Sequence, residues 1–247
     1  MGDLKKLAGQ TAIYGIPTIV GRFLNYLLVP IYTYSLTADK YGVVSELYAY
    51  VSFLMILLTY GMETAFFRFS QTHNDKKTVF NTAMLSLFST TTLFLLITMS
   101  NLGAISDLMG YSEHKNYITM FLFIIALDAL RAIPYAKLRQ ENKAARFAMI
   151  KSIDIFSNIA FNLFFFFVIK PEDLVQCIFL SNLLASAIAM LMLLPEYIQF
   201  RFKIDFKLLK KMLLYGLPVM IGGDTFPCCL LQKSGGWRNP CAGARIR

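Results

Sequence analysis

Two charged residues lie three positions apart inside an otherwise apolar run, where ionisable side chains are rare. Asp128 and Arg131 fall within residues 117–136 and share one helix face, because side chains at this spacing are neighbours. Two interpretations stay open. Either the pair neutralises itself and holds helices together, or Asp128 binds a proton or sodium ion and so releases Arg131 to bind an anion such as phosphate.

A second polar group repeats at steps of four residues within the run 147–169. Asp154, Asn158 and Asn162 therefore form a stripe along one helix face. Such a stripe suits the hydroxyl groups of a sugar, and Asp154 is a further candidate for binding a coupling ion. The same residues would also hydrogen-bond between helices in lipid, so a structural role stays open.

Arg22 is the single charge in the run 11–36. The polar residues at four-residue spacing along its face are Tyr14, Thr18, Arg22 and Tyr26. A guanidinium group makes bidentate contacts with phosphate oxygens, so Arg22 is a candidate for binding an anionic substrate. The alternative is a structural arginine paired with an acid of another helix, such as Glu63 or Asp128.

Helix-bending residues precede Arg22 in the same run. Pro17 removes a backbone hydrogen bond, and Gly15 and Gly21 flank it. These three residues are hinge candidates for a conformational change, or an ordinary kink of a membrane helix.

Glu63 is the single charge in the run 47–67. It is a candidate for binding a coupling ion. The alternative is an interfacial pair with Arg68, which follows five residues later.

The composition excludes a water-soluble globule. The 247 residues are 56% hydrophobic and 16% charged, against about 25% charged in an ordinary soluble domain. Because a helix needs about 20 mostly apolar residues to cross a bilayer, we predict six spans. These are residues 11–36, 47–67, 79–102, 117–136, 147–169 and 174–195. The predicted fold class is an all-α polytopic membrane protein, with six helices in one lobe and the beginning of a seventh.

Lys and Arg concentrate on one side of this map, as expected when the basic loops stay in the cytoplasm. With the N-terminus cytoplasmic, the outer loops hold only three, Lys40, Lys115 and Lys170. The inner segments hold fifteen, namely Lys5, Lys6, Arg68, Lys76, Lys77, Lys137, Arg139, Lys143, Arg146, Lys151, Arg201, Lys203, Lys207, Lys210 and Lys211. This split accounts for the net charge of +9 without a nucleic-acid partner. Residues 201–211 alternate apolar and basic residues, as an interfacial helix or an ordinary basic loop would.

An internal repeat opens the first and the seventh apolar runs. Residues 14–21, YGIPTIVG, match residues 215–222, YGLPVMIG, at Tyr, Gly, Pro and Gly. Many transporters consist of such repeats, with a substrate site between them. We therefore expect a six-helix lobe over residues 1–211 and the start of a second lobe over 212–223. Residues 224–247 differ in composition, and we expect an aberrant tail, frameshifted or disordered, that leaves the second lobe incomplete. The alternative is a genuine short tail with a reactive pair, Cys228 and Cys229.

Enzyme motifs are missing from the sequence. It has no paired catalytic carboxylates, nucleophile elbow, HExxH or P-loop, and its two histidines, His73 and His114, lie in different polar segments. We expect no enzymatic activity, no cofactor and no metal site.

Three segments carry a family resemblance: LKKLAGQTAIYGIPTIVGRFLNYLLVPIYTYSLTADKYGVVSELYAY, RAIPYAKLRQENKAARFAMIKSIDIFSN and KKMLLYGLPVMIGG. The sequence resembles bacterial polysaccharide biosynthesis proteins of the O-antigen flippase type, in the multidrug/oligosaccharidyl-lipid/polysaccharide exporter superfamily. The resemblance covers about residues 1–223 and implies twelve to fourteen helices in two lobes.

The resemblance also implies a function. It predicts export of lipid-linked oligosaccharide, of the polyprenyl-pyrophosphate type, across the bacterial inner membrane for lipopolysaccharide O-antigen. The implied partners are this substrate, membrane lipids and the polysaccharide assembly machinery, and Arg22, Arg131, Asn158 and Asn162 are the expected substrate contacts. Two alternatives stay open: a multidrug exporter of the same superfamily, and a non-transporting remnant or assembly partner.

Overall fold

The computed structural model describes residues 19, 21, 23, 28–30, 32–34, 36–73, 75–169, 173–202 and 204–222. Every regular element in these ranges is helical. Among the described residues, five helical segments are long and apolar enough to cross a membrane: Ala38–Thr72, Lys76–Ser100, Lys115–Gln140, Ala144–Ile169 and Leu174–Met192. They match five of the predicted runs and confirm an all-α, multi-pass membrane protein. Most of the run 11–36 lies outside the described residues.

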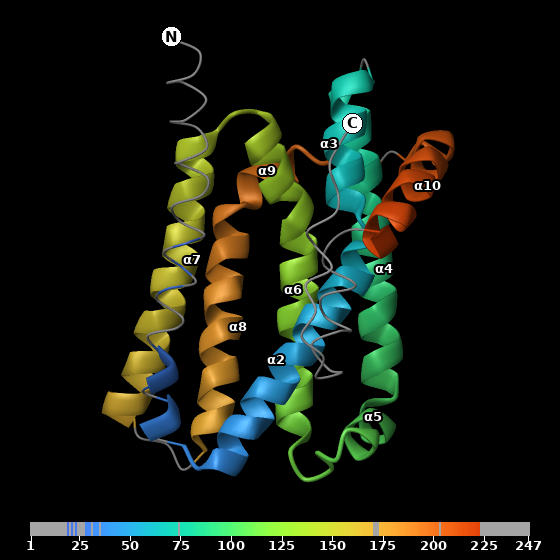
Figure 1. Ribbon diagram of the computed structural model, residues 1–247. Coiled ribbons are helices and arrows are strands. Elements are labelled where there is room, and N and C mark those ends of the chain that lie inside the picture. The colour runs from blue at the N-terminus through green and yellow to red at the C-terminus, as the bar shows by residue number, and fades with distance from the viewer. Residues whose placement is uncertain are drawn as a thin grey trace, which may run out of the picture.

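The first described span is two helices rather than the single one predicted over residues 47–67. Helix α2 (Ala38–Thr59) ends at Tyr60, and α3 (Met62–Thr72) begins after Gly61. Both linking residues have positive φ, 33° at Tyr60 and 69° at Gly61. Glycine adopts this conformation readily because it has no Cβ. The chain changes direction at this break (Figure 1).

Helix α6 (Lys115–Gln140) runs through the middle of the bundle and is the most buried of the five spans. It follows α4 (Lys76–Ser100) and the short α5 (Leu102–Leu108). Asp75 caps α4 by accepting hydrogen bonds from the backbone N–H groups of Lys77 and Thr78. The hydrogen bond from the Thr78 hydroxyl, with these backbone bonds, holds the pKa of the Asp75 carboxyl below its usual value.

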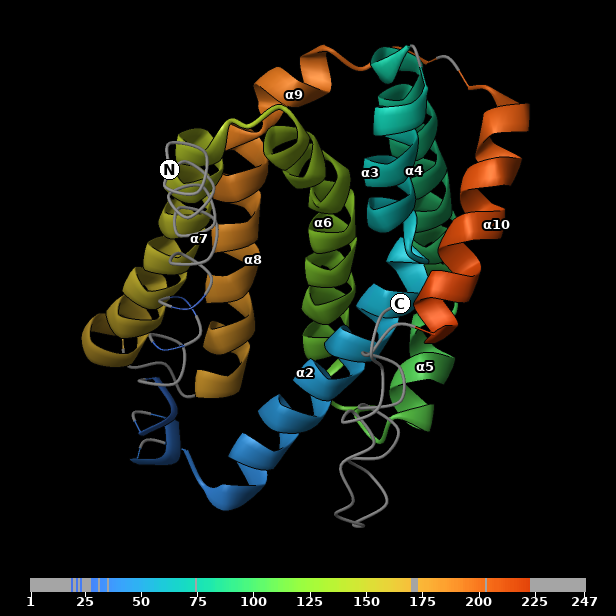
Figure 2. The same ribbon diagram turned by 45° about the horizontal axis from the view of Figure 1, so that its top comes forward.

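Helices on the two sides of α6 form separate halves of the bundle (Figure 2). On one side lie α7 (Ala144–Phe164), extended by a π-helical stretch over Phe165–Ile169, and α8 (Leu174–Met192). On the other side lie α3, α4 and α10 (Phe206–Gly222), which the short α9 (Leu194–Ile198) and a connection join to α8. The apolar run predicted from Met212 is thus part of a helix that begins six residues earlier.

The two ends of the bundle differ in charge. The α3–α4, α6–α7 and α9–α10 connections meet at one end, and most of the described Lys and Arg residues lie on these connections or on the adjoining parts of the helices (Figure 1). The described acids at or near the other end are Asp39, Glu46, Asp107, Glu113 and Asp173. There, the Tyr111 hydroxyl donates to Glu46 Oε2 at 2.9 Å, and burial together with this bond raises the pKa of Tyr111 to about 12. Successive described spans therefore run in opposite directions, and the basic residues gather at one end of the bundle, as the distribution of Lys and Arg in the sequence predicted.

Candidate functional site

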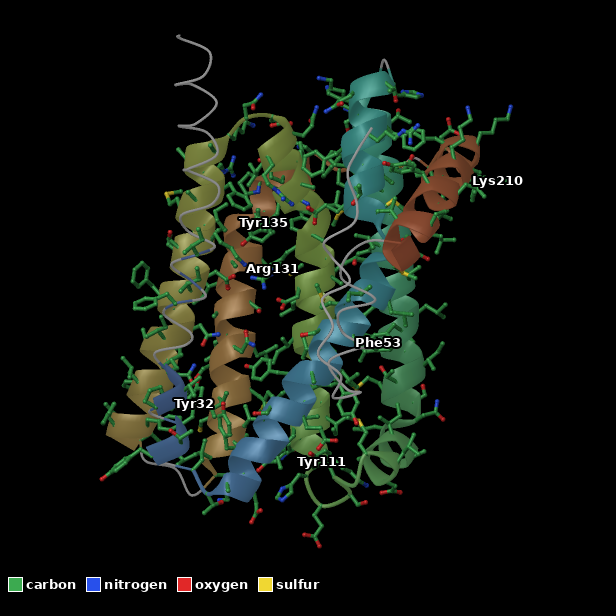
Figure 3. All side chains as sticks on the ribbon, viewed as in Figure 1. Tyr32, Phe53, Tyr111, Arg131, Tyr135 and Lys210 are labelled. Carbon is green, nitrogen blue, oxygen red and sulfur yellow. The ribbon has the colours of Figure 1, made fainter. Side chains whose placement is uncertain are left out.

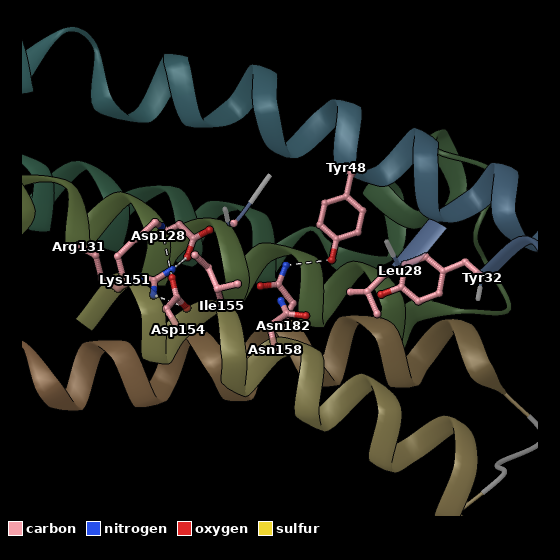
Figure 4. Close-up of a pocket in the computed structure, with 11 residues that line it drawn as sticks. Leu28, Tyr32, Tyr48, Asp128, Arg131, Lys151, Asp154, Ile155, Asn158 and Asn182 are labelled. Atoms are coloured by element: carbon pink, nitrogen blue, oxygen red, sulfur yellow. Dashed lines mark hydrogen bonds and ion pairs between the residues drawn. The ribbon is translucent and has the colours of Figure 1, made fainter. Parts of the chain in front are cut away.

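A polar cavity of about 500 Å³ lies between the α7–α8 pair and helices that precede it in the chain (Figure 4). The described residues that precede α2 are called the first segment below. Its wall combines residues of the first segment, α2, α6, α7 and α8. The lining residues are Gly21, Leu28, Tyr32, Tyr48, Asp128, Arg131, Lys151, Asp154, Ile155, Asn158 and Asn182. Charged side chains gather at one end of the cavity and tyrosines at the other, with two asparagines between them (Figure 4).

Arg131 joins three helices at the charged end of the cavity. Its side chain is 6% exposed, forms an ion pair with Asp128 on α6, and lies 3.3 Å from Asp154 Oδ1 on α7. It also donates to the Ser186 hydroxyl on α8 at 3.1 Å, and that hydroxyl donates to Asp128 Oδ1 at 3.0 Å. The buried Nε of Arg131 has no hydrogen-bond partner among the described residues, so the guanidinium keeps one donor unused.

The charges at this end balance among the described residues. Lys151 Nζ lies 3.4 Å from Asp154 Oδ2, so two cations face two carboxylates. Such pairing reduces the large cost of placing charge at bilayer depth. An anion that binds here must therefore compete with Asp128 and Asp154 for Arg131.

Asparagine and tyrosine side chains form the rest of the polar wall. Asn182 on α8 donates to the Tyr48 hydroxyl on α2 at 2.9 Å. The Tyr32 hydroxyl donates to Asn162 Oδ1 at 3.0 Å, and Asn162 in turn donates to Asn158 Oδ1 at 2.7 Å. Asn158 lines the cavity, whereas Asn162 is only 2% exposed and supports the wall from behind.

The structure thus brings together several residues that the sequence singled out. Asp128, Arg131, Asp154 and Asn158 line one cavity, with Asn162 bonded to it. Arg22 lies outside the described residues, as do Gly15 and Pro17. Gly21 is described, and a Cβ added there would lie 2.5 Å from Ile155 Cδ1, so this glycine permits close packing of the first segment on α7.

Glu63 lies away from the cavity and has a different partner from the one expected. The pairing with Arg68 is wrong, because Glu63 forms its ion pair with Arg139 of α6. The break at Gly61 places Glu63 in the first turn of α3, which packs on α6. Arg68 instead stacks on the Tyr215 ring of α10, 4.2 Å from its centroid.

Sequence reasoning missed four polar lining residues and one polar supporting residue: Tyr32, Tyr48, Lys151, Asn182 and Ser186. Two signals could have revealed some of them. Asn182 and Ser186 are four residues apart in a run without charges, and Lys151 precedes Asp154 by three positions. Nothing in the sequence distinguishes Tyr32 and Tyr48 from the other tyrosines.

The fold resembles that of a solved transporter. The match is to a structure described as the outward-facing conformation of a multidrug resistance MATE family transporter of the MOP superfamily. The TM-score is 0.67 with 18% sequence identity, over 86% of this chain and 52% of that chain. This chain therefore spans about half the length of that structure, and at such identity the likeness concerns the fold alone.

Sequence comparison identifies the family. No curated protein matches the chain. The family model for polysaccharide biosynthesis proteins, however, matches residues 7–225, which include every residue that lines the cavity. The chain therefore belongs to the polysaccharide biosynthesis protein family.

Proposed function

We propose that the chain forms one lobe of a transporter that moves lipid-linked oligosaccharides across the bacterial inner membrane. The polar cavity carries this proposal, because it places two cations beside amide and hydroxyl groups inside a membrane-spanning bundle. Family membership and a fold shared with a solved multidrug resistance transporter support it. Transport proceeds by alternating access against a second lobe.

The cavity suits the two polar parts of such a substrate. A polyprenyl-pyrophosphate linkage presents phosphate oxygens, which guanidinium and ammonium groups bind. Arg131 and Lys151 supply these groups at one end of the cavity. Asn158, Asn182 and Tyr48 offer hydrogen bonds to sugar hydroxyls. Arg22, one position after the lining residue Gly21, adds a further cation to the proposed substrate contacts.

The pairing of Arg131 suggests how an ion gradient drives release and binding. Protonation or cation binding at Asp128 or Asp154 weakens their hold on the guanidinium, which then becomes available to phosphate. Deprotonation restores the ion pairs and displaces the anion. Such an exchange makes the two ligands mutually dependent, as coupled transport requires.

The charged ends of the bundle support an orientation. The positive-inside rule favours a cytoplasmic location for the basic end, in keeping with the expectation from the sequence that the N-terminus is cytoplasmic. In this orientation the substrate enters from the cytoplasmic side and leaves on the outer side.

A binding measurement tests the proposal without requiring a second lobe. A fluorescent polyprenyl-pyrophosphate oligosaccharide is titrated with the purified chain in neutral detergent, and anisotropy gives the dissociation constant. Lys151→Gln is expected to weaken binding about tenfold, because a hydrogen bond to a charged group contributes about 1.5 to 3 kcal/mol. Lys40→Gln, which removes an exposed lysine at the acidic end, is the matched control and is expected to bind normally.

Three outcomes separate the alternatives. Equal dissociation constants for Lys151→Gln and Lys40→Gln would contradict the proposal that the cavity binds the phosphates of the substrate. Binding of tetraphenylphosphonium in place of the oligosaccharide, abolished by Asp154→Asn, would identify a multidrug exporter, which the two cavity carboxylates suit. Binding of neither ligand would indicate a non-transporting assembly partner.

A further inference from the structure

A second cavity, of about 620 Å³, lies at the basic end of the bundle. Its wall comes from the start of α4, the end of α6 and the α9–α10 connection. The basic residues on it are Lys76, Lys77, Lys137 and Arg201. None of these residues lines the polar cavity described above, so the two sites are separate.

Three of these four cations have no ion-pair partner among the described residues. Lys137 is held by Glu196, 2.7 Å away, and by Gln199, 2.6 Å away. Lys76, Lys77 and Arg201 are exposed, and their side chains have no carboxylate partner within the described part of the chain.

The carboxylates on the rim are already occupied. Asp75 caps α4 through the N–H groups of Lys77 and Thr78, and Glu141 Oε2 lies 2.7 Å from Lys143 Nζ. The cavity therefore has an excess of positive charge and available donors, which favours an anionic ligand.

Large apolar side chains project beside these cations. Ile198, Phe202 and Phe206 are 80%, 78% and 73% exposed. Their segment is held against α4, because the Arg201 N–H donates to Asn81 Oδ1 at 3.1 Å and the Asp205 N–H donates to Thr82 Oγ1 at 3.3 Å. A fixed connection that exposes both cations and bulky apolar groups is typical of a surface lying at the lipid headgroups.

We propose that this end of the bundle binds the phosphate of anionic phospholipids in the surrounding bilayer. Lys76, Lys77 and Arg201 contact the headgroup phosphate, and Ile198, Phe202 and Phe206 enter the adjoining acyl region. The exposed lysines of α10, among them Lys210, lie near the same end of the bundle (Figure 3). The proposal requires only that the chain lies in a membrane, and it does not depend on what the polar cavity carries.

The test is the binding of fluorescent phosphatidylglycerol to the purified chain in neutral detergent, followed by anisotropy. Each cation near an anionic lipid surface contributes about fivefold in affinity, so the triple variant Lys76→Gln/Lys77→Gln/Arg201→Gln is expected to bind about a hundredfold more weakly. The control Lys40→Gln/Lys115→Gln removes exposed lysines from the opposite end and is expected to bind as the native chain does. Binding is also expected to weaken as salt is raised.

Several results would overturn the proposal. These are equal affinity for phosphatidylglycerol and phosphatidylcholine, unchanged binding by the triple variant, and an equal loss in the Lys40→Gln/Lys115→Gln control. Displacement of the lipid by glycerol phosphate at similar concentration would identify a site for soluble anions instead. Retention of oligosaccharide-lipid binding by the triple variant is expected, and it keeps this test independent of the transport proposal.

Discussion

The halves of the bundle on the two sides of α6 are held together by different interactions. Between α6, α7 and α8, an arginine, two carboxylates and a serine hydroxyl form a connected network. Between α3, α4 and α10, the buried residues are mainly apolar and include Met62, Phe66, Phe80, Met84 and Met212. Polar side chains bond across that half at one buried contact among those described, between Tyr60 and Ser86, 2.6 Å apart.

From this difference we infer a functional role for one half of the bundle and a structural role for the other. Charged groups at bilayer depth are costly and are retained where they face a cavity or one another. Apolar and small side chains pack helices without that cost. We therefore propose that the α7–α8 half holds the ligand and ion sites of the polar cavity, and that the α3–α4–α10 half is a scaffold whose stability depends on close backbone packing.

The strongest way to disrupt the polar half is to leave Arg131 without its nearest partner. We expect Asp128→Ala to lower the free energy of unfolding by about 3 kcal/mol, since breaking a buried ion pair exposes an uncompensated charge to an apolar surrounding. Asp154 stays in place and limits the loss to the lower end of the usual range. Thermal unfolding in detergent measures the effect, with Asp39→Ala, an exposed acid of α2, as the control.

A double variant distinguishes ion pairing from a general packing defect. Asp128→Ala/Arg131→Met removes both charges, while Lys151 and Asp154 still pair. We expect this variant to unfold at a higher temperature than Asp128→Ala alone. A double variant that loses the sum of the two single losses would show that the network adds nothing beyond its separate side chains.

The scaffold half is most sensitive at Gly61. A Cβ there would overlap the backbone carbonyl oxygen of Gly216 on α10, and Gly61 also has a φ of 69°. Gly110 is the matched control, because its φ is 78° but nothing lies within 4 Å of an added Cβ. Gly110→Ala should cost about 1 to 2 kcal/mol, the penalty of a left-handed conformation for an L-residue.

Gly61→Ala should cost more than that, because α10 must also move away from the α2–α3 break. Thermal unfolding gives the two losses, and limited proteolysis of α10 reports the displacement. Equal losses in Gly61→Ala and Gly110→Ala would mean that contact with Gly216 contributes nothing to stability.

Hydropathy and charge were sufficient to predict five of the six expected spans and the polar residues of α6 and α7. Asp128, Arg131, Asp154 and Asn158 meet in one cavity, because polar groups in a membrane bundle turn away from lipid. The break at Tyr60 and Gly61 was not predicted, since averaged hydropathy is insensitive to two residues with positive φ.

Ion pairs between residues on different helices also could not be predicted from the sequence. Arg131 pairs with Asp154, which is 23 positions away, and Glu63 pairs with Arg139. Such pairs depend on the rotation and crossing of whole helices, which a single sequence pattern does not determine. Asn182 was missed for another reason, because its run contains no charge to draw attention to it.

The smallest expected effect concerns Asn182 and Tyr48, where α8 meets α2 at the wall of the cavity. Their hydrogen bond is 2.9 Å long, so Asn182→Ala and Tyr48→Phe should each lower the free energy of unfolding by about 1 kcal/mol. Because both changes break the same bond, the double variant should lose less than the sum of the two. Asn116→Ala, at an exposed amide in the first turn of α6, should change stability by less than about 0.5 kcal/mol. Strictly additive losses at Asn182 and Tyr48 would mean that the wall is held by packing, and the contrast between the two halves would then rest on the charged network alone.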